Sequence, residues 1–515
     1  MRDLVSCSEA SRLDAETSAR AALPSLLLME DASLRLWGAL APLAEARGAG
    51  RSGGLVAICG SGNNGGDALA LLRHARFSGA MRVAAILAGR PGELASLHAA
   101  SLKALGVPVL DWNGDRLLCE RQLSEASLVV DGLSGTGLSG RLREELSSLL
   151  DALRSSAPIA SLDLPSGLSD SFGDGFPIVS AEWTLSIEPR KACLYFPAAR
   201  EYSGEIVPIE GVFPEDALVT ASAGLLDAGD LDLLAPLPPD AAHKGERGRV
   251  AVFAGSVGSS GAAVLASRSC LAAGAGIAAL FASGDLYPTV ASMLDAVMVK
   301  PEPEDGGFDE GRWQALLVGP GWGKGPPRQK RLAALLGSGL PAVLDADAIS
   351  LFRELLDSGF SAPGTIVLTP HPGEFAALTG IGPERSLANP AAVLPEAAKA
   401  LKAVIVLKSQ VTWIASPSGE LAVWDGMESG LGTAGSGDVL AGLVAGLLAR
   451  LAAGTGSTKA RGRSVEADAV AFSAARAAVI AHGLAGRASR EAYGWFEAGT
   501  LVTEAARILG RRAPA

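Results

Sequence analysis

The stretch "GSGNNGGD", residues 60–67, joins the apolar run "GGLVAIC" at 53–59 to "DALALLRHA" at 67–75, which has helical spacing. Gly60, Gly62 and Gly65 match the G-x-G-x-x-G pattern of a dinucleotide-binding turn. A strand, a glycine turn and a helix N-terminus in this order form the unit of a parallel α/β sheet and make a place for an anion. The stretch therefore predicts an α/β fold with a ligand-binding turn.

The same pattern does not by itself establish NAD as a cofactor. The acidic residue expected about 20 positions later is missing, because the strand "MRVAAIL" at 81–87 runs into "AGRPGE" without a well-placed carboxylate. No Lys-Ser or Lys-Thr pair follows the glycines, which excludes a P-loop. The turn instead offers oxygen atoms from Asn63, Asn64 and Asp67. A polar ligand and a dinucleotide cofactor both remain open at this point.

Composition favours small-molecule partners. The 515-residue chain has a formal charge of −11 and only 5% aromatic residues, so it lacks the basic footprint of a nucleic-acid-binding protein. Its five cysteines lie far apart without a C-x-x-C pair, which argues against a zinc site or a disulfide framework. The N-terminus has no apolar signal region, and stretches such as "SCLAAGAGIAALFASG" are too short and glycine-broken to span a membrane. We expect a cytoplasmic protein without membrane or nucleic-acid partners that forms a homo-oligomer.

Helical and strand-like segments alternate in two separate series. In the first series, strands are expected at 54–59, 81–87, 107–110, 127–131, 158–162 and 182–187. A Pro- and Asp-rich stretch at 214–242 predicts a linker, and a second series then begins with "RVAVFAG". This organisation predicts two different doubly wound α/β domains, 1–213 and 243–515.

The second half carries its densest chemistry in "GTAGSGDVLAGLVAGLLA", residues 432–449. Gly435, Ser436 and Gly437 are expected to form a turn whose N–H groups, with the following helix N-terminus, make an anion hole. Asp438 at its mouth can take a proton from a hydroxyl while the hole stabilises a transferring phosphoryl group. The alternative is an Asp that only caps the helix.

Other predicted strand ends place polar groups where α/β sheets bind ligands. "GPGWG" at 319–323 lets the backbone approach a ligand, and Asp345 and Asp347 in "LDADAIS" are either cation ligands or helix caps. His371 in "LTPHPGEF" is either a ligand contact or a structural residue, and Lys408 can reach phosphates or adenine.

These motifs together resemble a known family. In the second half, "HKGERGRVAVFAGSVGSSGAAVLASRSCLAAGAG", "GPGWG", "LDADAISLF", "LTPHPGEFAALTG", "VLKSQVTWI", "GTAGSGDVLAG" and "AHGLAGRAS" match, in order, the ribokinase-like ADP- or ATP-dependent NAD(P)H-hydrate dehydratases. The first half resembles NAD(P)H-hydrate epimerase domains through "LPSLLLMEDAS", "GSGNNGGDALALLRHA", "VVDGLSGTGLSGRLRE" and "SLDLPSGLSD". The whole chain is thus similar to the fused bifunctional repair enzymes.

The resemblance implies that the dinucleotide is a damaged substrate rather than a hydride carrier. In the family, water has added across the C5–C6 bond of the reduced nicotinamide ring, giving R and S hydrates of NADH or NADPH (NADHX and NADPHX). The epimerase interconverts the two forms. The dehydratase then uses ADP or ATP with Mg²⁺ to make the hydroxyl a leaving group and restores NADH or NADPH.

The resemblance also assigns residues in the first domain. It places Asp163 as the acid/base group, and it places K⁺ on Asn64, Asp131 and Ser166. The remaining implied substrate contacts are Asn63, Asn64, Gly65, Gly66, Asp67, Gly135, Thr136, Gly137 and Arg141.

In the second domain, Asp438 matches the base that activates the hydroxyl. The other implied contacts with the hydrated nicotinamide are Ala262, Gly321 and His371, and those with the nucleotide are Lys408, Ser409, Gln410, Val411, Thr412 and Gly437. The chain departs from the family at Asp31 and Ala68 in the first half and at Glu428 and Gly432 in the second.

Two alternatives remain open. The ribokinase-like half could be a vitamin or small-molecule kinase that stops at a phosphorylated product. The first half could be a non-catalytic binding or oligomerisation module, because α/β folds are reused for many purposes.

Overall fold

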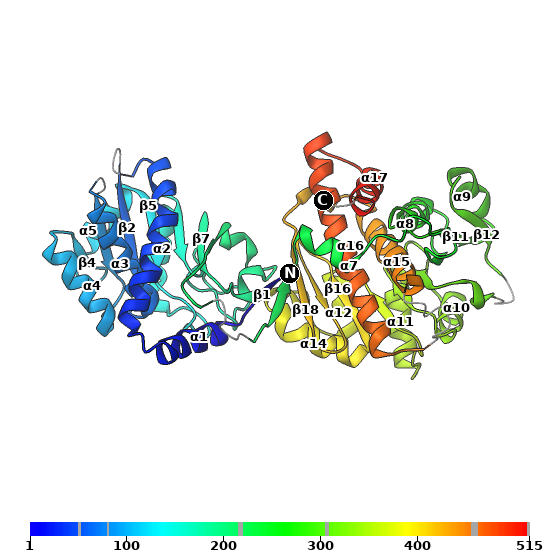
Figure 1. Ribbon diagram of the computed structural model, residues 1–515, viewed down its shortest axis with the longest axis horizontal. Coiled ribbons are helices and arrows are strands. Elements are labelled where there is room, and N and C mark those ends of the chain that lie inside the picture. The colour runs from blue at the N-terminus through cyan, green and yellow to red at the C-terminus, as the bar shows by residue number, and fades with distance from the viewer. Residues whose placement is uncertain (50–52, 80–81, 215–219, 304–307, 455–461, 512–515) are drawn as a thin grey trace. The chain divides into compact units, whose positions relative to one another are not determined.

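The computed structural model describes residues 1–49, 53–79, 82–214, 220–303, 308–454 and 462–511 (Figure 1). The chain divides into two compact units, which are described separately. The N-terminal unit comprises Asp3–Ser222 with Leu387–Asn389, and the C-terminal unit comprises Met1–Arg2, Ala223–Ser386 and Pro390–Ala515. Within the stretch predicted as a linker, 215–219 lie outside the described residues, and Ala223–Leu225 (β9) and Leu231–Leu234 (α7) are regular elements of the C-terminal unit.

A parallel sheet of seven strands forms the centre of the N-terminal unit, in the order β4-β3-β2-β5-β6-β7-β8. Six of its strands begin and end close to the expected positions, although residue 81 of one expected strand lies outside the described residues, and the seventh, β8, was not expected. The strands are β2 (Gly54–Cys59), β3 (Val83–Leu87), β4 (Val109–Asp111), β5 (Ala126–Gly132), β6 (Ile159–Leu162), β7 (Trp183–Ile187) and β8 (Glu205–Ile209).

Helices cover both faces of this sheet because its strands are apolar on both sides. Leu55 and Ala57 belong to a core that includes residues of α2 and α3, whereas Val56 and Ile58 pack into a second core with residues of α5 and α6. The helices are α1 (Cys7–Arg20), α2 (Ser25–Ala46), α3 (Asn63–Phe77), α4 (Glu93–Ala104), α5 (Arg116–Ser124) and α6 (Ser147–Arg154), with short 3₁₀ turns η1 (Glu144–Leu146), η2 (Ala192–Tyr195) and η3 (Arg200–Ser203). The predicted doubly wound architecture is confirmed here.

The C-terminal unit is built on a mixed sheet in the order β9-β18-β17-β16-β15-β14-β13-β10-β11-β12. Its central part is parallel, as predicted for a doubly wound domain, but β16, β17 and β18 pair antiparallel because they are joined by short turns. The strands are β9 (Ala223–Leu225), β10 (Arg249–Phe253), β11 (Ile277–Ala282), β12 (Met298–Pro301), β13 (Ala315–Val318), β14 (Ala342–Leu344), β15 (Ile366–Leu368), β16 (Ala403–Leu407), β17 (Val411–Ala415) and β18 (Leu421–Asp425). The short strand β1 (Arg2–Leu4) is divided between the two units, with Arg2 in this one.

Helices again flank this sheet (Figure 1). They are α7 (Leu231–Leu234), α8 (Ser260–Ala272), α9 (Tyr287–Met293), α10 (Pro326–Gly337), α11 (Asp347–Asp357), α12 (Pro372–Thr379), α13 (Pro383–Ala388), α14 (Pro390–Leu401), α15 (Ser436–Gly454), α16 (Val465–Tyr493) and α17 (Ala498–Leu509), with 3₁₀ turns η4 (Ala228–Asp230), η5 (Glu310–Arg312) and η6 (Ser429–Gly432).

Two helices, α15 and α16, are long and apolar enough to cross a bilayer, which the sequence analysis did not anticipate. In the structure α15 contacts α8 and α16, and 67% and 72% of the apolar windows of α15 and α16 are buried inside the unit. Their apolar composition is therefore accounted for by packing in the protein core, since core helices pass the same test of length and hydropathy.

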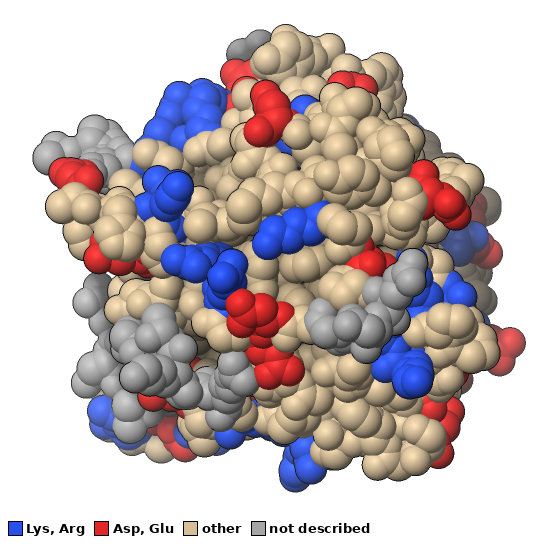
Figure 2. All heavy atoms as spheres, turned by 90° about the vertical axis from the view of Figure 1, so that its right-hand side faces the viewer, with Lys and Arg blue, Asp and Glu red and all other residues tan. Residues whose placement is uncertain are grey.

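The face of the molecule on the right of Figure 1 is shown from the front in Figure 2. Basic and acidic side chains are interspersed on it among uncharged residues. The absence of a nucleic-acid partner stays a prediction from composition.

Candidate active sites

In the N-terminal unit, the quoted glycine stretch connects β2 to α3. The helix begins at Asn63 with Gly62 as its N-cap, so residues 63–67 form its first turn rather than the expected loop. Glycine is required by packing, because a Cβ on Gly60 would lie 1.9 Å from the carbonyl oxygen of Leu133. The close approach brings the N-terminus of α3 against the loop that follows β5.

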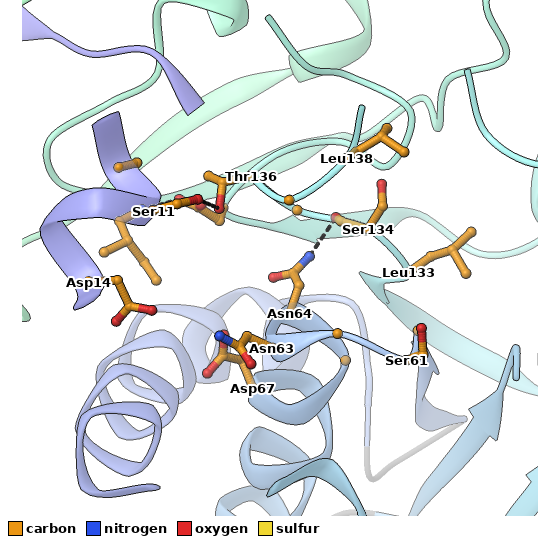
Figure 3. Close-up of a pocket in the computed structure, with 18 of the residues that line it drawn as sticks. Ser11, Asp14, Ser61, Asn63, Asn64, Asp67, Leu133, Ser134, Thr136 and Leu138 are labelled. Carbon is orange, nitrogen blue, oxygen red and sulfur yellow. Dashed lines mark hydrogen bonds between the residues drawn. The ribbon is translucent and has the colours of Figure 1, made fainter. Parts of the chain in front are cut away.

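A cavity of about 740 Å³ opens at this carboxyl edge of the sheet (Figure 3). Nearly all predicted substrate contacts line it, namely Asn63, Asn64, Gly65, Asp67, Gly135, Thr136, Gly137, Arg141 and Asp163. Gly66 does not, because it faces α2, where a Cβ would lie 2.7 Å from Met29 Cε. Asp14 and Ser11 of α1 and Lys191 also line the cavity, although the sequence analysis did not select them.

Two of the predicted K⁺ ligands, Asp131 and Ser166, contact each other directly. Ser166 Oγ donates to Asp131 Oδ1 at 2.6 Å, while the backbone N–H of Ser166 and the hydroxyl of Ser161 donate to Oδ2 at 2.9 and 2.8 Å. Asp131 is fully buried. Burial raises the pKa of its carboxyl, and the hydrogen bonds, which lower it, only partly offset this effect. Among the described residues, no Lys or Arg is paired with this carboxyl.

The third predicted ligand, Asn64, joins the same network through the backbone. Its amide Nδ2 donates to the carbonyl oxygens of Ser134 at 2.7 Å and Leu162 at 3.1 Å. Ser134 in turn donates its N–H to Ser166 Oγ at 2.8 Å. The structure therefore brings the three residues to one place, from the ends of β2, β5 and β6.

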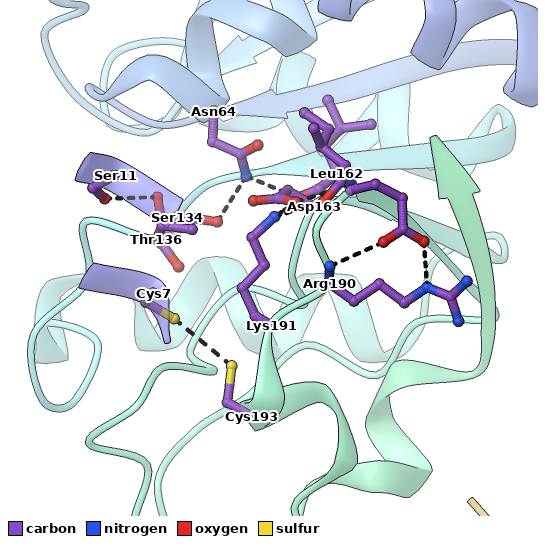
Figure 4. Close-up of polar contacts among 12 residues, drawn as sticks. Cys7, Ser11, Asn64, Ser134, Thr136, Leu162, Asp163, Arg190, Lys191 and Cys193 are labelled. Atoms are coloured by element: carbon purple, nitrogen blue, oxygen red, sulfur yellow. Dashed lines mark hydrogen bonds and ion pairs between the residues drawn. The ribbon is translucent and has the colours of Figure 1, made fainter. Parts of the chain in front are cut away.

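Asp163 sits in the left-handed backbone region, with φ of +63°, directly after β6. Its carboxylate is ion-paired with Lys191 and accepts the N–H of Ile187 at 3.1 Å (Figure 4). Lys191 is buried and also donates to the carbonyl oxygen of Ile187 at 2.9 Å. An unfavourable backbone conformation that is fixed by such contacts is typical of functional residues.

The carboxyls of two further residues face the same cavity from two different helices, Asp14 from α1 and Asp67 from α3 (Figure 3). Burial, reinforced by the negative charges of Asp163 and Asp14, raises the pKa of Asp67 well above its usual range. Burial and the charge of Asp163 likewise raise the pKa of Asp14. The cavity thus holds a lysine-paired carboxylate together with two carboxyls whose pKa is raised.

Of the two departures from the family in this unit, Ala68 lies next to these groups, because it directly follows Asp67 in α3. Asp31 is on the surface, where it accepts a hydrogen bond from Arg35 Nε at 2.8 Å. Ala68 is fully buried. Its Cβ packs so closely against Gly132 that a Cβ added to Gly132 would lie only 2.6 Å away from it.

In the C-terminal unit, Lys408 joins the ends of three neighbouring parallel strands. Its Nζ donates to Asp345 Oδ1 at 2.8 Å, and Thr369 Oγ1 donates to the same oxygen at 2.7 Å. Burial opposes the charged form of Lys408, yet the carboxylates of Asp345, Glu374 and Asp438 raise its pKa overall. A Cβ on Gly437 would lie 3.4 Å from Nζ, so the ammonium also reaches the N-terminus of α15.

Asp438 lies in the first turn of α15. The helix starts at Ser436, within the loop expected at 435–437, and not after that loop. Burial, with the nearby charge of Asp345, raises the pKa of Asp438 to about 6, and Lys408 acts in the opposite direction. Gly435 has φ of +88°, which lets the chain turn into the helix.

His482 of α16 supports this turn and was not selected from the sequence. Its Nε2 lies 3.1 Å from both the hydroxyl and the carbonyl oxygen of Ser436. Burial lowers the pKa of His482 to about 4, so the ring is neutral at physiological pH.

The remaining predicted contacts occupy nearby strand ends. A Cβ on Gly321, which has φ of +56°, would lie 2.7 Å from the Cβ of Ser259 and 3.2 Å from that of Ala262, so these backbones touch. His371 is the N-cap of α12: its Nδ1 accepts the N–H groups of Gly373 at 3.0 Å and Glu374 at 3.2 Å. The structure thus shows a capping role for His371, and its contact with substrate stays a prediction.

The segment 408–412 comprises the turn at 408–410 between β16 and β17 and the first two residues of β17. Ser409 Oγ donates to the carbonyl oxygen of Val411 at 2.5 Å, and Thr412 Oγ1 donates to that of Ser409 at 3.3 Å. The carbonyl oxygen of Gln410 accepts the N–H of Met427.

Glu428, a departure from the family, caps η6. It accepts the N–H of Gly430 at 2.8 Å and pairs with Arg490 at 3.3 Å, and η6 ends at Gly432, the other departure.

Comparisons with known proteins agree with both halves. A family model described as NAD(P)H-hydrate dehydratase matches residues 250–511, and one described as YjeF-related protein N-terminus matches residues 25–193. The bifunctional NAD(P)H-hydrate repair enzyme Nnr of Moorella thermoacetica is 30% identical over 466 residues, which cover 86% of this chain and 87% of the relative. That of Gloeobacter violaceus is 36% identical over 470 residues, covering 87% and 89%.

Among solved structures, an ADP/ATP-dependent NAD(P)H-hydrate dehydratase from Bacillus subtilis, co-crystallised with ATP/Mg²⁺, is 24% identical. It matches 56% of this chain and 97% of its own length, with a TM-score of 0.48.

Two α/β units, each with polar groups gathered at the carboxyl edge of a parallel sheet, define a two-site α/β enzyme. The family models and relatives show that the chain belongs to the bifunctional NAD(P)H-hydrate repair enzymes, with an epimerase and a dehydratase domain. They support this function rather than the alternative of a small-molecule kinase with a non-catalytic first domain.

Proposed function

We propose that the cavity of the N-terminal unit interconverts the R and S hydrates and that the Asp438 edge of the C-terminal unit dehydrates the S form with ADP or ATP. The observation that supports the first assignment is the meeting of Asp163, Asp67 and Asp14 in one cavity. The second is supported by the position of Asp438 at the start of α15, near the ion pair of Asp345 with Lys408.

The epimerase chemistry follows from the different environments of these carboxyls: Asp163 is paired with Lys191, whereas the pKa of Asp67 and that of Asp14 are raised. The C6 hydroxyl of the hydrate leaves as water once a protonated carboxyl, Asp67 with Asp14 beside it, donates its proton, and C6 then forms a double bond to the ring nitrogen. Water adds to the opposite face of C6 while Asp163 accepts the proton that it loses. One proton is given and one is taken, so atoms and charge balance, and the cycle closes when the proton gained by Asp163 returns to Asp67 through water in the cavity. Lys191 positions Asp163 through their ion pair.

The residues present fit a bound K⁺. A fully buried carboxyl without a basic partner in the described part of the chain carries a large desolvation cost, which a monovalent cation would offset. Asp131, Ser166 and Asn64 offer only hard oxygen ligands, and the ion would fix the loops around the cavity. The bound ion would act through its charge and by holding these loops in place.

In the dehydratase site, Asp438 would accept the proton of the substrate hydroxyl while the hydroxyl oxygen takes the transferred phosphoryl group. The N–H groups at the start of α15 and the Lys408 ammonium fit the phosphates of the nucleotide. The phosphate then leaves from C6 with its bonding electrons, C5 loses a proton to solvent water, and the C5–C6 double bond of the reduced nicotinamide is restored. Asp347, which accepts the N–H of Gly323 at 2.8 Å, offers a carboxylate for Mg²⁺, which would neutralise phosphate charge when bound.

The epimerase assignment is tested with pure R hydrate, excess nucleotide and heavy-oxygen water. We expect wild-type enzyme to consume the R form, with label appearing in the remaining hydrate, and Asp163→Asn to lose both signals. Turnover of pure S hydrate, which bypasses the first site, serves as the control for folding and dehydratase activity. R-hydrate conversion by Asp163→Asn at the wild-type rate would show that this carboxylate is only structural.

A further inference from the structure

Two thiols separated by 186 residues lie against each other in the N-terminal unit. Cys7 Sγ and Cys193 Sγ are 3.7 Å apart, and both cysteines are free and buried, with 3% and 0% of their surface exposed (Figure 4). The sequence analysis expected no thiol-based metal site because it found no C-x-x-C pair. The fold nevertheless brings the start of α1 onto η2, so that these two distant thiols meet.

Asp170 completes a group of three ligands. Its Oδ2 accepts the backbone N–H groups of Cys7 at 2.7 Å and Ser8 at 3.4 Å, which holds the carboxylate at the N-terminus of α1. One ligand atom from each of Cys7, Asp170 and Cys193 lies within 4.8 Å of the others. Within the described residues, this is the one group of three such side chains with that geometry.

The spacing of the thiols suits a tetrahedral ion. With Zn–S bonds of about 2.3 Å, two thiolates on a tetrahedral Zn²⁺ are about 3.8 Å apart, which is close to the observed separation. A disulfide would require the sulfurs to approach to about 2.05 Å. The positive end of the α1 dipole, at which Cys7 and Asp170 lie, also favours an anionic ligand set.

We propose that Cys7, Cys193 and Asp170 bind one thiophilic divalent cation of the zinc class, with water as the fourth ligand. Asp170 is only partly buried, so the water position faces its side of the site. This proposal does not depend on the epimerase mechanism.

The position of the site couples it to the cavity. Cys193 follows Lys191 by two residues, and Lys191 is ion-paired with Asp163. Cys7 begins the helix that carries Ser11 and Asp14 to the cavity wall. A bound ion would therefore fasten α1 to the segment that positions Asp163.

The test is a titration of the full-length protein with Cd²⁺ after reduction and removal of metals by a chelator. We expect one Cd²⁺ per chain and a thiolate-to-metal absorption band in the ultraviolet, with Zn²⁺ displacing it. Because losing even an outer-shell partner costs roughly 10- to 100-fold in affinity, Cys7→Ser and Cys193→Ser should each weaken binding by about 100-fold or more. Cys119→Ser, which alters another buried free thiol, should leave binding unchanged.

Asp170→Asn guards against a simple loss of folding. An amide oxygen can still accept the N–H of Cys7, so α1 stays capped, while the carboxylate ligand is lost; the thiolate band should persist with weaker affinity. The proposal is overturned if Cd²⁺ binding is absent, if it survives both cysteine substitutions, or if thiol counting shows that the pair forms a disulfide whenever reductant is removed and excludes the metal.

Discussion

The acidity of Asp438 makes a quantitative prediction for the dehydratase. Its pKa is raised to about 6 by burial and by the charge of Asp345, so the base is ionised only above that pH. For pure S hydrate, kcat/KM should rise with pH, bend near pH 6 and reach a plateau; at pH 5 only about one-eleventh of Asp438 is ionised, which predicts a rate about tenfold below the plateau.

Asp345→Asn tests the cause of the shift. It removes the like charge and releases Lys408 toward Asp438, so both changes lower the pKa of Asp438, and the bend should move down by roughly one pH unit or more. Asp347→Asn is the comparison variant. It should lower the rate by weakening the proposed Mg²⁺ site, but its bend should stay near pH 6, because Asp347 contacts the Gly323 N–H instead of Lys408. The assay follows the returning absorbance of reduced nicotinamide. The assignment of Asp438 as the base would be refuted if the bend of the pH profile did not move in Asp345→Asn, or if Asp438→Asn kept near-normal turnover.

Three other perturbations have defined outcomes. Lys191→Met should lower R-hydrate conversion by about 10²-fold or more through misplacement of Asp163, with S-hydrate turnover unchanged; equal losses on both epimers would indicate general unfolding instead. Asp131→Asn should remove any dependence of R-hydrate conversion on K⁺, measured by exchanging K⁺ for a bulky organic cation, and a persisting dependence would place the ion elsewhere. Gly60→Ala should lower the free energy of unfolding of the N-terminal unit by about 1–3 kcal/mol, because the new Cβ would lie 1.9 Å from a carbonyl oxygen. Gly62→Ala is the control, because a Cβ there would have nothing within 4 Å. Similar melting temperatures for the two variants would contradict the packing argument.

Local sequence patterns predicted the parts of this protein that depend on neighbouring residues. The run 53–75 combines apolar residues, closely spaced glycines and good helix formers, so the strand, turn and helix could be placed without tertiary information. Asp438 was found for the same reason, because the glycines and the apolar helix beside it are adjacent in the chain. The predicted starts of α3 and α15 were wrong by a few residues; for α3, the glycine N-cap leaves no side-chain signal.

Residues that act through distant contacts could not be found this way. Lys191 follows the end of β7, where a search of every strand end would have reached it, but its pairing with Asp163 depends on the order of strands in the sheet. Asp14 lies on a helix with no motif, and only the fold brings it to the cavity. The contact of Cys7 with Cys193 likewise has no trace in their sequence spacing.

The most direct measurement incubates the purified chain with an equal mixture of R and S hydrates, K⁺, Mg²⁺ and either ADP or ATP, and follows the recovery of reduced nicotinamide. A chain with both activities should convert essentially all of the hydrate at enzyme-driven rates, with one nucleotide phosphate consumed per molecule restored. Recovery that stops near half would show that the N-terminal unit does not epimerise, and accumulation of a stable phosphorylated hydrate would show that the C-terminal unit is a kinase rather than a dehydratase.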